Sequence, residues 1–429
     1  MTVLAGAVPG ARADLTSATI QALRMAGMIT GGSMPASAPE FATMVSSIQA
    51  GNYAAAAQAA INSAYFPSYL PRRMARQMMN THLSEIGVND NDATLFILAN
   101  LIGSSTTASI SALWSQNATY LVNVAGVPTH VGTLTAAQLA AVNWRTDIVK
   151  NVGQTALILN GTASDGSQLY APITIPVADV GGYMTLNNTK ATGGGALDAS
   201  FAQNGLLAGT NLRAIEGMYI TTLGLSLPQM VGSVTATAND APRFIPQLNP
   251  SFSVGQGQPA CLSCHGAGAS NLSHGYQAFA DKYDFDPDHG LIYFPTPTTS
   301  TRKSLGSDPG LRNTVLNCNL NNSPAPNCNT GTASKTSSQS WDLASWMQSG
   351  LLTQWGWSGS TSGSGLNALG AALGKAGLVY EFLTNRVIQE ICPLGTFTPA
   401  QIDAIAATAQ TQDSFASIVS AVATDLSCL

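Results

Sequence analysis

Charged side chains are scarce in this sequence of 429 residues, where they make up only 9% of the total. An ordinary soluble domain carries about 25% of them. The net charge of -5 leaves no basic excess to neutralise phosphates, so nucleic acid is not an expected partner. Hydrophobic residues reach 45%, which excludes an intrinsically disordered chain. The surface is therefore expected to be polar but largely neutral.

Long hydrophobic runs are also lacking. Residues 93–144 contain no Asp, Glu, Lys or Arg, but their longest apolar block, residues 95–102, is interrupted by Asn100 and followed by a Gly-Ser-Thr stretch. A helix needs about 20 mostly apolar residues to cross a bilayer. We therefore expect no membrane span.

Cysteine and histidine are rare, with six and five residues, but three of them form a motif. The segment Cys261-Leu-Ser-Cys264-His265 has the C-x-x-C-H pattern of covalent haem attachment. In this pattern the two thiols bond to the haem vinyl groups, and the imidazole is the proximal ligand of the iron. The motif predicts one covalent haem c, with a dithiol or metal site as the alternative. A zinc site would need further Cys or His residues at short spacing, which the other cysteines do not provide.

Covalent haem c is attached outside the cytoplasm, so we expect an exported protein at the cell surface, in the extracellular space or in the periplasm. Such compartments also favour disulfides. The four cysteines outside the motif allow three pairings. The simplest one joins Cys318 to Cys328 across a turn-rich loop with two prolines, and then Cys392 to Cys428 by elimination.

Apolar residues at helical spacing predict a mainly α chain with few short strands. At residues 14–28, for example, Leu15, Ile20, Leu23 and Met28 recur at near-helical spacing. The other predicted helices cover residues 38–49, 53–64, 71–86, 93–101, 107–115, 136–150, 211–224, 366–391, 399–409 and 414–426.

Local signals mark several ends of these elements. Thr135 and Thr398 each precede a Gln by three residues, which is the capping-box pattern of a helix start. Asp413 is the expected start of the last helix. Two strands are expected at residues 169–177 and 291–294, where prolines predict positions at sheet edges.

A change in composition near residue 235 predicts two domains. Residues 1–235 are expected to form a mostly helical domain. Residues 236–429 are expected to form a loop-rich, helical, cytochrome c-like haem domain. Between residues 285 and 339 the chain is rich in Ser, Thr, Asn, Pro and Gly and loses periodicity. A loop of this length in an ordered protein is functional, disordered or an extended arm, and the expected disulfide within it favours order.

From about residue 200 the order of features resembles the planctomycete-type exported cytochrome c family, whose modules have no assigned function. The matching pieces are residues 204–210, the haem motif, Gly275-Tyr276 with nearby aromatic residues, and a helical tail over residues 379–429. The resemblance implies an exported single-haem cytochrome. It implies functional roles only for Cys261, Cys264 and His265.

The ligand on the other face of the iron distinguishes a sealed electron carrier from an open, reactive haem. His289 is the first candidate, because it lies in an Asp-Pro-Asp-His-Gly turn followed by apolar residues. His274 and Met347 are lower candidates. His274 is only nine residues from the motif, and Met347 lies beside a tryptophan in a predicted helix.

Three functions fit these features. The first is electron transfer to a redox partner protein or an extracellular electron acceptor. The second is a haem enzyme of the peroxidase or oxygenase type, and the third is a structural filament or layer protein whose haem supports the fold. Few charges also mean little repulsion between copies, so a homo-oligomer or filament is expected, with residues 285–339 reaching a neighbour.

Overall fold

The computed structural model describes residues 15–79, 92–103, 109–165, 168–186, 223–224, 283–286, 290–293, 340–343 and 350–429. Within these ranges the chain is mainly helical, with small sheets, as the apolar spacing predicts. The described residues form two compact units. The boundary expected near residue 235 and most of the loop expected at 285–339 lie outside the described residues.

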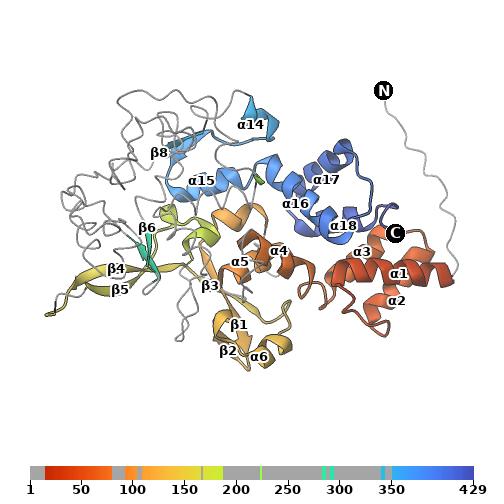
Figure 1. Ribbon diagram of the computed structural model, residues 1–429, viewed down its shortest axis with the longest axis horizontal. Coiled ribbons are helices and arrows are strands. Elements are labelled where there is room, and N and C mark those ends of the chain that lie inside the picture. Colours follow the sequence, from red (N-terminus) through yellow and green to blue (C-terminus); the bar gives the residue numbers. More distant parts are fainter. Residues whose placement is uncertain are drawn as a thin grey trace, which may run out of the picture. The chain divides into compact units, whose positions relative to one another are not determined.

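The first unit takes in the described residues up to Met74, together with Asn143–Arg145 and Tyr380–Leu429. Its helices are α1 (Leu15–Thr30), α2 (Pro39–Gln49), α3 (Tyr53–Asn62), α17 (Pro399–Gln412) and α18 (Phe415–Ala423). Helices α4 (Leu70–Met79) and α16 (Gly377–Ile391) contribute residues to both units. Helix α18 packs against α1 and α3, so the two ends of the chain share one core (Figure 1).

The buried face of α1 is made largely of small residues. Ala18 and Ala22 are fully buried beside Met25, and α2 and α3 pack against this helix. Ile20 and Leu23, whose spacing helps to predict the helix, are 48% and 50% exposed. The apolar residues that predict the helix are therefore not the ones that form its core face.

Capping residues fix several helix ends as expected. Thr135 and Thr398 each form a reciprocal capping box with the Gln three residues later. Asp413 does not start the last helix, which is a correction. It ends α17 in the left-handed conformation with φ of 49°, and Ser414 caps α18 by accepting a hydrogen bond from the amide of Ser417. Such a left-handed residue satisfies the last carbonyls of a helix.

The second unit takes in the described residues of Ala75–Val142 and Thr146–Val379. Helix α5 (Asp92–Ile102) lies within it and is buried at all eleven positions. The first part of the charge-free stretch, residues 93–102, therefore belongs to a core helix that is covered on every side. None of the described helices is long and apolar enough to span a membrane.

The rest of the second unit consists of short helical elements and small sheets. The helical elements are η2 (Ser111–Trp114), η3 (Val131–Thr133), α6 (Ala136–Ala141), η4 (Val177–Asp179), η5 (Gly182–Thr185), α14 (Leu351–Gln354) and α15 (Leu366–Leu373). The strands are β1 (Ala118–Val124), β2 (Val127–Thr129), β3 (Ile148–Val152), β4 (Thr155–Thr162), β5 (Gln168–Thr174), β6 (Tyr283–Asp286), β7 (Gly290–Tyr293), β8 (Ser340–Asp342) and β9 (Ser362–Ser364). Of these elements, β1, η2, η3 and η5 contact α5.

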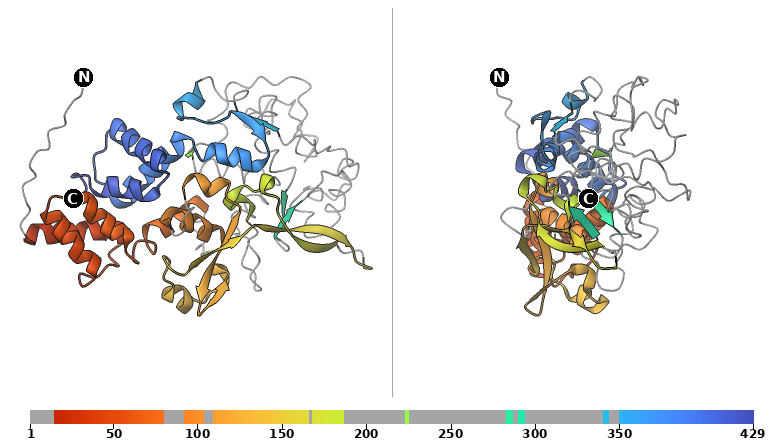
Figure 2. Two further views of the ribbon diagram at one scale, coloured as in Figure 1. Left: turned by 180° about the vertical axis from the view of Figure 1, so that it is seen from behind. Right: turned by 90° about the vertical axis from the view of Figure 1, so that its left-hand side faces the viewer.

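These strands form three sheets, with the orders β2-β1-β3, β5-β4-β7-β6 and β8-β9. Strands β4 and β7 run parallel, and the other pairs are antiparallel. Figure 2 shows β4 and β5 as a long twisted ribbon. Strand β5 lies at a sheet edge, as its proline predicts, whereas β7 lies between β4 and β6 and corrects the edge position expected for residues 291–294.

Three predicted helices differ from the structure. The helix expected at 136–150 ends at Ala141, and residues 148–152 instead form β3, which pairs with β1. The helix expected at 366–391 is broken between α15 and α16 at Gly374, where an added Cβ would lie 2.4 Å from the carbonyl oxygen of Ser111. Of residues 107–115, only Ser111–Trp114 are helical among those described. In the first two cases a contact distant in sequence overrides the local pattern.

Candidate functional site

The residues predicted to bind haem lie outside the described ranges. This applies to the attachment residues Cys261, Cys264 and His265. It applies equally to the three candidates for the distal ligand, His274, His289 and Met347, and to the predicted pair Cys318 and Cys328. All of these assignments therefore stay predictions from the sequence.

A disulfide joins Cys392 to Cys428, as the pairing by elimination predicts. Their Cα atoms are 5.4 Å apart, and 36 positions separate the two residues in the sequence. Cys392 directly follows α16 and is buried, while Cys428 lies beyond the end of α18. The bond ties α16 to the segment after α18 within the first unit.

A cavity of about 440 Å³ adjoins this disulfide. Gly27 and Met28 of α1 line one side, while Cys392 and Leu394 after α16 line the other. Glu390, at the rim, is held by an ion pair with Arg73 at 2.6 Å. The lining is mixed, since it combines polar residues such as Arg24 and Ser427 with apolar ones such as Met28 and Leu394.

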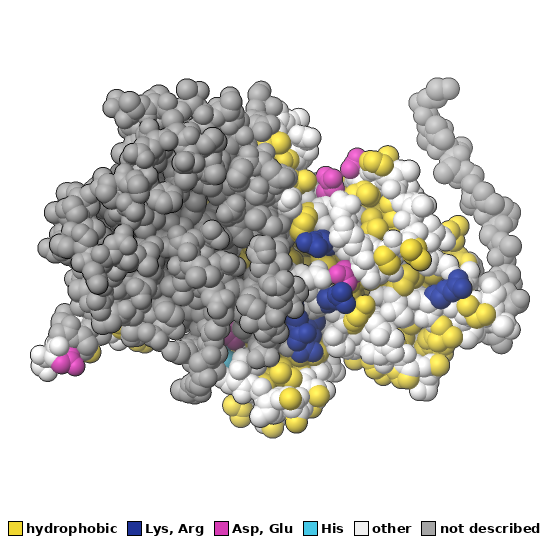
Figure 3. Space-filling view, in the orientation of Figure 1, with side chains coloured by type: hydrophobic (Ala, Val, Ile, Leu, Met, Phe, Trp, Pro, Cys, Tyr) yellow, Lys and Arg dark blue, Asp and Glu magenta, His cyan; other side chains and the backbone are white. Residues whose placement is uncertain are grey.

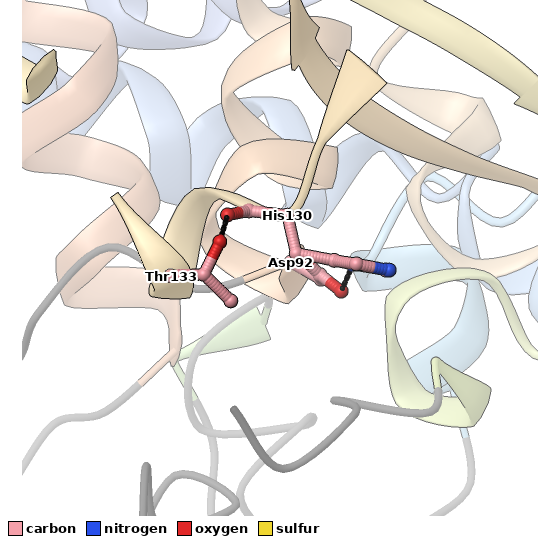
Figure 4. A network of polar contacts seen from close by, with 3 residues as sticks. All are labelled: Asp92, His130 and Thr133. Carbon is pink, nitrogen blue, oxygen red and sulfur yellow. Dashed lines mark hydrogen bonds and ion pairs between the residues drawn. The ribbon is translucent and has the colours of Figure 1, made fainter. Parts of the chain in front are cut away.

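The second unit contains a carboxylate–imidazole pair that the sequence does not reveal. Asp92 begins α5, and His130 lies between β2 and η3. The Nδ1 atom of His130 is 2.6 Å from Oδ2 of Asp92 (Figure 4). The Asp92 side chain is buried, and in the described part of the chain its Oδ1 atom has no hydrogen-bond partner.

Electrostatics favour the charged imidazole in this pair. The hydrogen bond that the imidazole donates to Asp92 raises the pKa of His130 above its usual value, and partial burial opposes this shift. The nearby hydroxyl of Thr133 donates to the backbone carbonyl of His130 at 2.7 Å and not to the ring (Figure 4). The contact described at the ring is thus that of a carboxylate–imidazole ion pair.

A further buried pair links η4 to β7. The hydroxyl of Tyr293 donates a hydrogen bond to the carboxylate of Asp179, and both side chains are buried. Burial raises the pKa of Tyr293 well above its usual value, and the adjacent carboxylate raises it further. The tyrosine therefore remains protonated, so that it can serve as the donor to Asp179.

Comparisons of this chain with protein-family models, with curated proteins and with solved structures found no match.

Proposed function

We propose that this protein is an exported mono-haem c-type cytochrome that transfers electrons. The observation that carries the proposal is the segment Cys261-Leu-Ser-Cys264-His265. Its donor set, two thiols separated by two residues and an imidazole directly after them, fits covalent haem c. Haem held there accepts and releases one electron at its iron.

The pair Cys392 and Cys428 supports the exported location. Disulfides form and persist mainly in oxidising compartments, and these two residues are joined by one. The same compartment is the one in which haem c is attached. The resemblance to exported single-haem cytochromes from about residue 200 onward points in the same direction.

The intact mass of the denatured protein tests the haem assignment. We expect it to exceed the mass of the polypeptide by one haem, because the thioether bonds survive denaturation. A variant with Cys261→Ser and Cys264→Ser is the control and should have the mass of the bare chain. A wild-type mass equal to that of the bare chain would refute the proposal.

Spectra of the haem protein test the distal ligand. If His289 is the sixth ligand, both oxidation states should be low-spin, and His289→Ala should allow carbon monoxide to bind the reduced protein. His274→Ala is the matched control and should leave the spectrum unchanged. If His289→Ala has no effect, the role passes to His274 or Met347.

Self-association is the second part of the proposal. One haem per chain allows conduction between proteins only where copies bring their haems close together. The scarcity of charge supports association, because electrostatic repulsion is the usual protection against it. The segment at 285–339, the predicted contact arm, lies largely outside the described residues.

A further inference from the structure

Strand β4 contains a bulge at Asn160. The preceding residues of β4 each face one residue of β5, and the last of these pairs joins Leu159 to Tyr170. The next pair joins Gly161 to Leu169, so Asn160 has no partner across the ladder. A bulge leaves its extra residue unpaired and bends the strand. The backbone of Asn160 is therefore less restrained than that of its neighbours in β4.

The side-chain amide of Asn160 is accessible to water. Asn160 and the following Gly161 are both exposed. In the described part of the chain, no hydrogen bond or ion pair holds the Asn160 side chain. By contrast, Asn100 donates to a backbone carbonyl at 2.9 Å, and Asn117 accepts a hydrogen bond from a backbone amide at 2.9 Å. The amide of Asn160 can therefore rotate without breaking a contact within the protein.

Gly161 leaves space around the peptide bond that follows Asn160. Its φ is 130°, and a Cβ atom built on it would have no neighbour within 4 Å. A residue without a Cβ allows close approach to its backbone atoms. This is the only Asn-Gly pair among the residues that the structure describes. The backbone nitrogen of Gly161 can therefore approach the side chain of Asn160.

We propose that Asn160 is a site of spontaneous deamidation. The backbone nitrogen of Gly161 loses its proton to hydroxide and attacks Cγ of Asn160. The new N–C bond closes a succinimide ring, and the bond from Cγ to Nδ2 breaks with loss of ammonia. Water then opens the ring at either carbonyl carbon and leaves aspartate or isoaspartate. The net change is the gain of one water and the loss of one ammonia, with no oxidant or reductant.

A regularly paired strand resists this reaction. Its extended backbone directs the next amide nitrogen away from the side-chain carbonyl carbon, and the ladder fixes that geometry. Asn123 of β1 is an example, because it is also exposed but pairs in register with Pro128. At the bulge the backbone of Asn160 can rotate before any pair of the ladder opens. The bulge therefore removes the restraint that protects asparagine in a strand.

The products would change a ribbon in a protein that has little charge. Either product replaces a neutral amide by a carboxylate, in a chain with 9% charged residues and sparse charges on its described surface (Figure 3). Isoaspartate also lengthens the main chain of β4 by one carbon atom. The pairs beyond the bulge, Gly161 with Leu169 and Thr162 with Gln168, should then weaken. The reaction needs neither haem nor a second copy of the chain, so it is independent of the proposed function.

Peptide mapping by mass spectrometry, after incubation of the purified haem protein at mildly alkaline pH, tests the proposal. The peptide that contains Asn160 should gain the mass difference between an amide and an acid. Chromatography should separate an aspartate form from an isoaspartate form. The rate should rise with pH, because the attacking nitrogen must lose its proton. Asn160→Gln keeps the amide but requires a larger ring, so this variant should not react.

Val124→Gly separates the effect of the bulge from that of the Asn-Gly pair. It places a glycine after Asn123, which is paired in β1. In the folded variant, Asn123 should react about tenfold more slowly than Asn160, because a pair of the ladder must open first. In denaturant the two should react at similar rates. Val152→Gly, after the paired Asn151 of β3, repeats the comparison if the first variant weakens its hairpin.

Three outcomes would overturn the inference. An Asn160 that reacts in denaturant but not in the folded protein would show that the folded ribbon blocks ring closure. Equal rates at Asn160 and at Asn123 of folded Val124→Gly would remove the bulge as the cause. Asn160 also begins an Asn-Gly-Thr sequence, the acceptor pattern for N-linked sugars. A heavier group on the freshly purified peptide that is lost in Thr162→Ala would therefore assign the site to an enzyme.

Discussion

Gln154 is a buried polar side chain that joins several elements of the second unit. It lies fully buried between β3 and β4, and its Nε2 donates to the carbonyls of Gln116, Ala118 and Gly182 at 3.0–3.2 Å. Its Oε1 accepts a hydrogen bond from the hydroxyl of Thr185 at 2.7 Å. The side-chain amide of Gln154 therefore links the segment just before β1 to β1 itself and to η5. Gln154→Met keeps the approximate volume and removes every one of these bonds.

The expected loss of stability follows from the groups left without a partner. A buried polar group that loses its only partner costs about 1–3 kcal/mol. Ala118 lies in β1, which is paired with β3, and the carbonyl of Gly182 keeps a contact with Thr185 at 3.3 Å, so the loss is not the full sum. We expect Gln154→Met to lower the free energy of unfolding of the second unit by about 3 kcal/mol. This corresponds to an opening equilibrium constant that is roughly 100-fold larger.

Hydrogen exchange read by mass spectrometry suits this test, because two units need not unfold as one transition. Peptides from α5 and β1 should exchange about 100-fold faster in Gln154→Met, whereas peptides from α1 and α3 in the first unit should not change. Gln401→Met, at an exposed capping box, is the matched control and should affect only the start of α17. Unchanged protection of α5 and β1 in Gln154→Met would refute the reasoning.

Three further substitutions test local features. Replacing Cys392 and Cys428 by Ser should destabilise the first unit by about 3–4 kcal/mol in a melting experiment, given the 36-residue separation, and an unchanged melt would contradict this. The pKa of His130 is higher in the folded chain than its usual value of 6.5, so the protonated imidazole stabilises the second unit fully below pH 6.5. This contribution of up to about 1 kcal/mol should disappear as the pH rises through the pKa of His130 in the folded chain. His130→Gln should remove that dependence, measured by hydrogen exchange of the peptides around Asp92. Thr398→Ala should cost about 1 kcal/mol in a melt of the first unit and leave the second unit unchanged.

Features that depend on neighbouring residues could be predicted from the sequence. The capping boxes at Thr135 and Thr398 need only a hydroxyl and an amide three residues apart, and both form as expected. The helices at residues 38–49 and 53–64 have nearly the predicted bounds, and both start at local signals: Pro39 in the first turn of α2, and the side chain of Asn52, which accepts a hydrogen bond from the amide of Ala55 in α3. The pairing of Cys392 with Cys428 follows by elimination once Cys318 is assigned to Cys328 across the short, turn-rich loop between them.

Features that depend on distant partners could not be predicted in this way. Residues 148–152 read as the end of a helix because the strand they pair with, β1, begins 30 positions earlier. Asp92 and His130 are 38 positions apart, and no sequence motif links a helix start to a residue after a hairpin. The ion pair between Asp92 and His130 can therefore be identified only from the folded structure, in which the two residues are in contact.

Helix α1 shows how a correct element can be predicted from residues with the wrong role. A helix with two apolar faces gives the same periodic signal whichever face is buried, so the spacing of Ile20 and Leu23 identifies the helix but not its orientation. The buried face of α1 instead consists of Ala18, Ala22, Met25, Ala26 and Ile29, and it packs against α2 and α3.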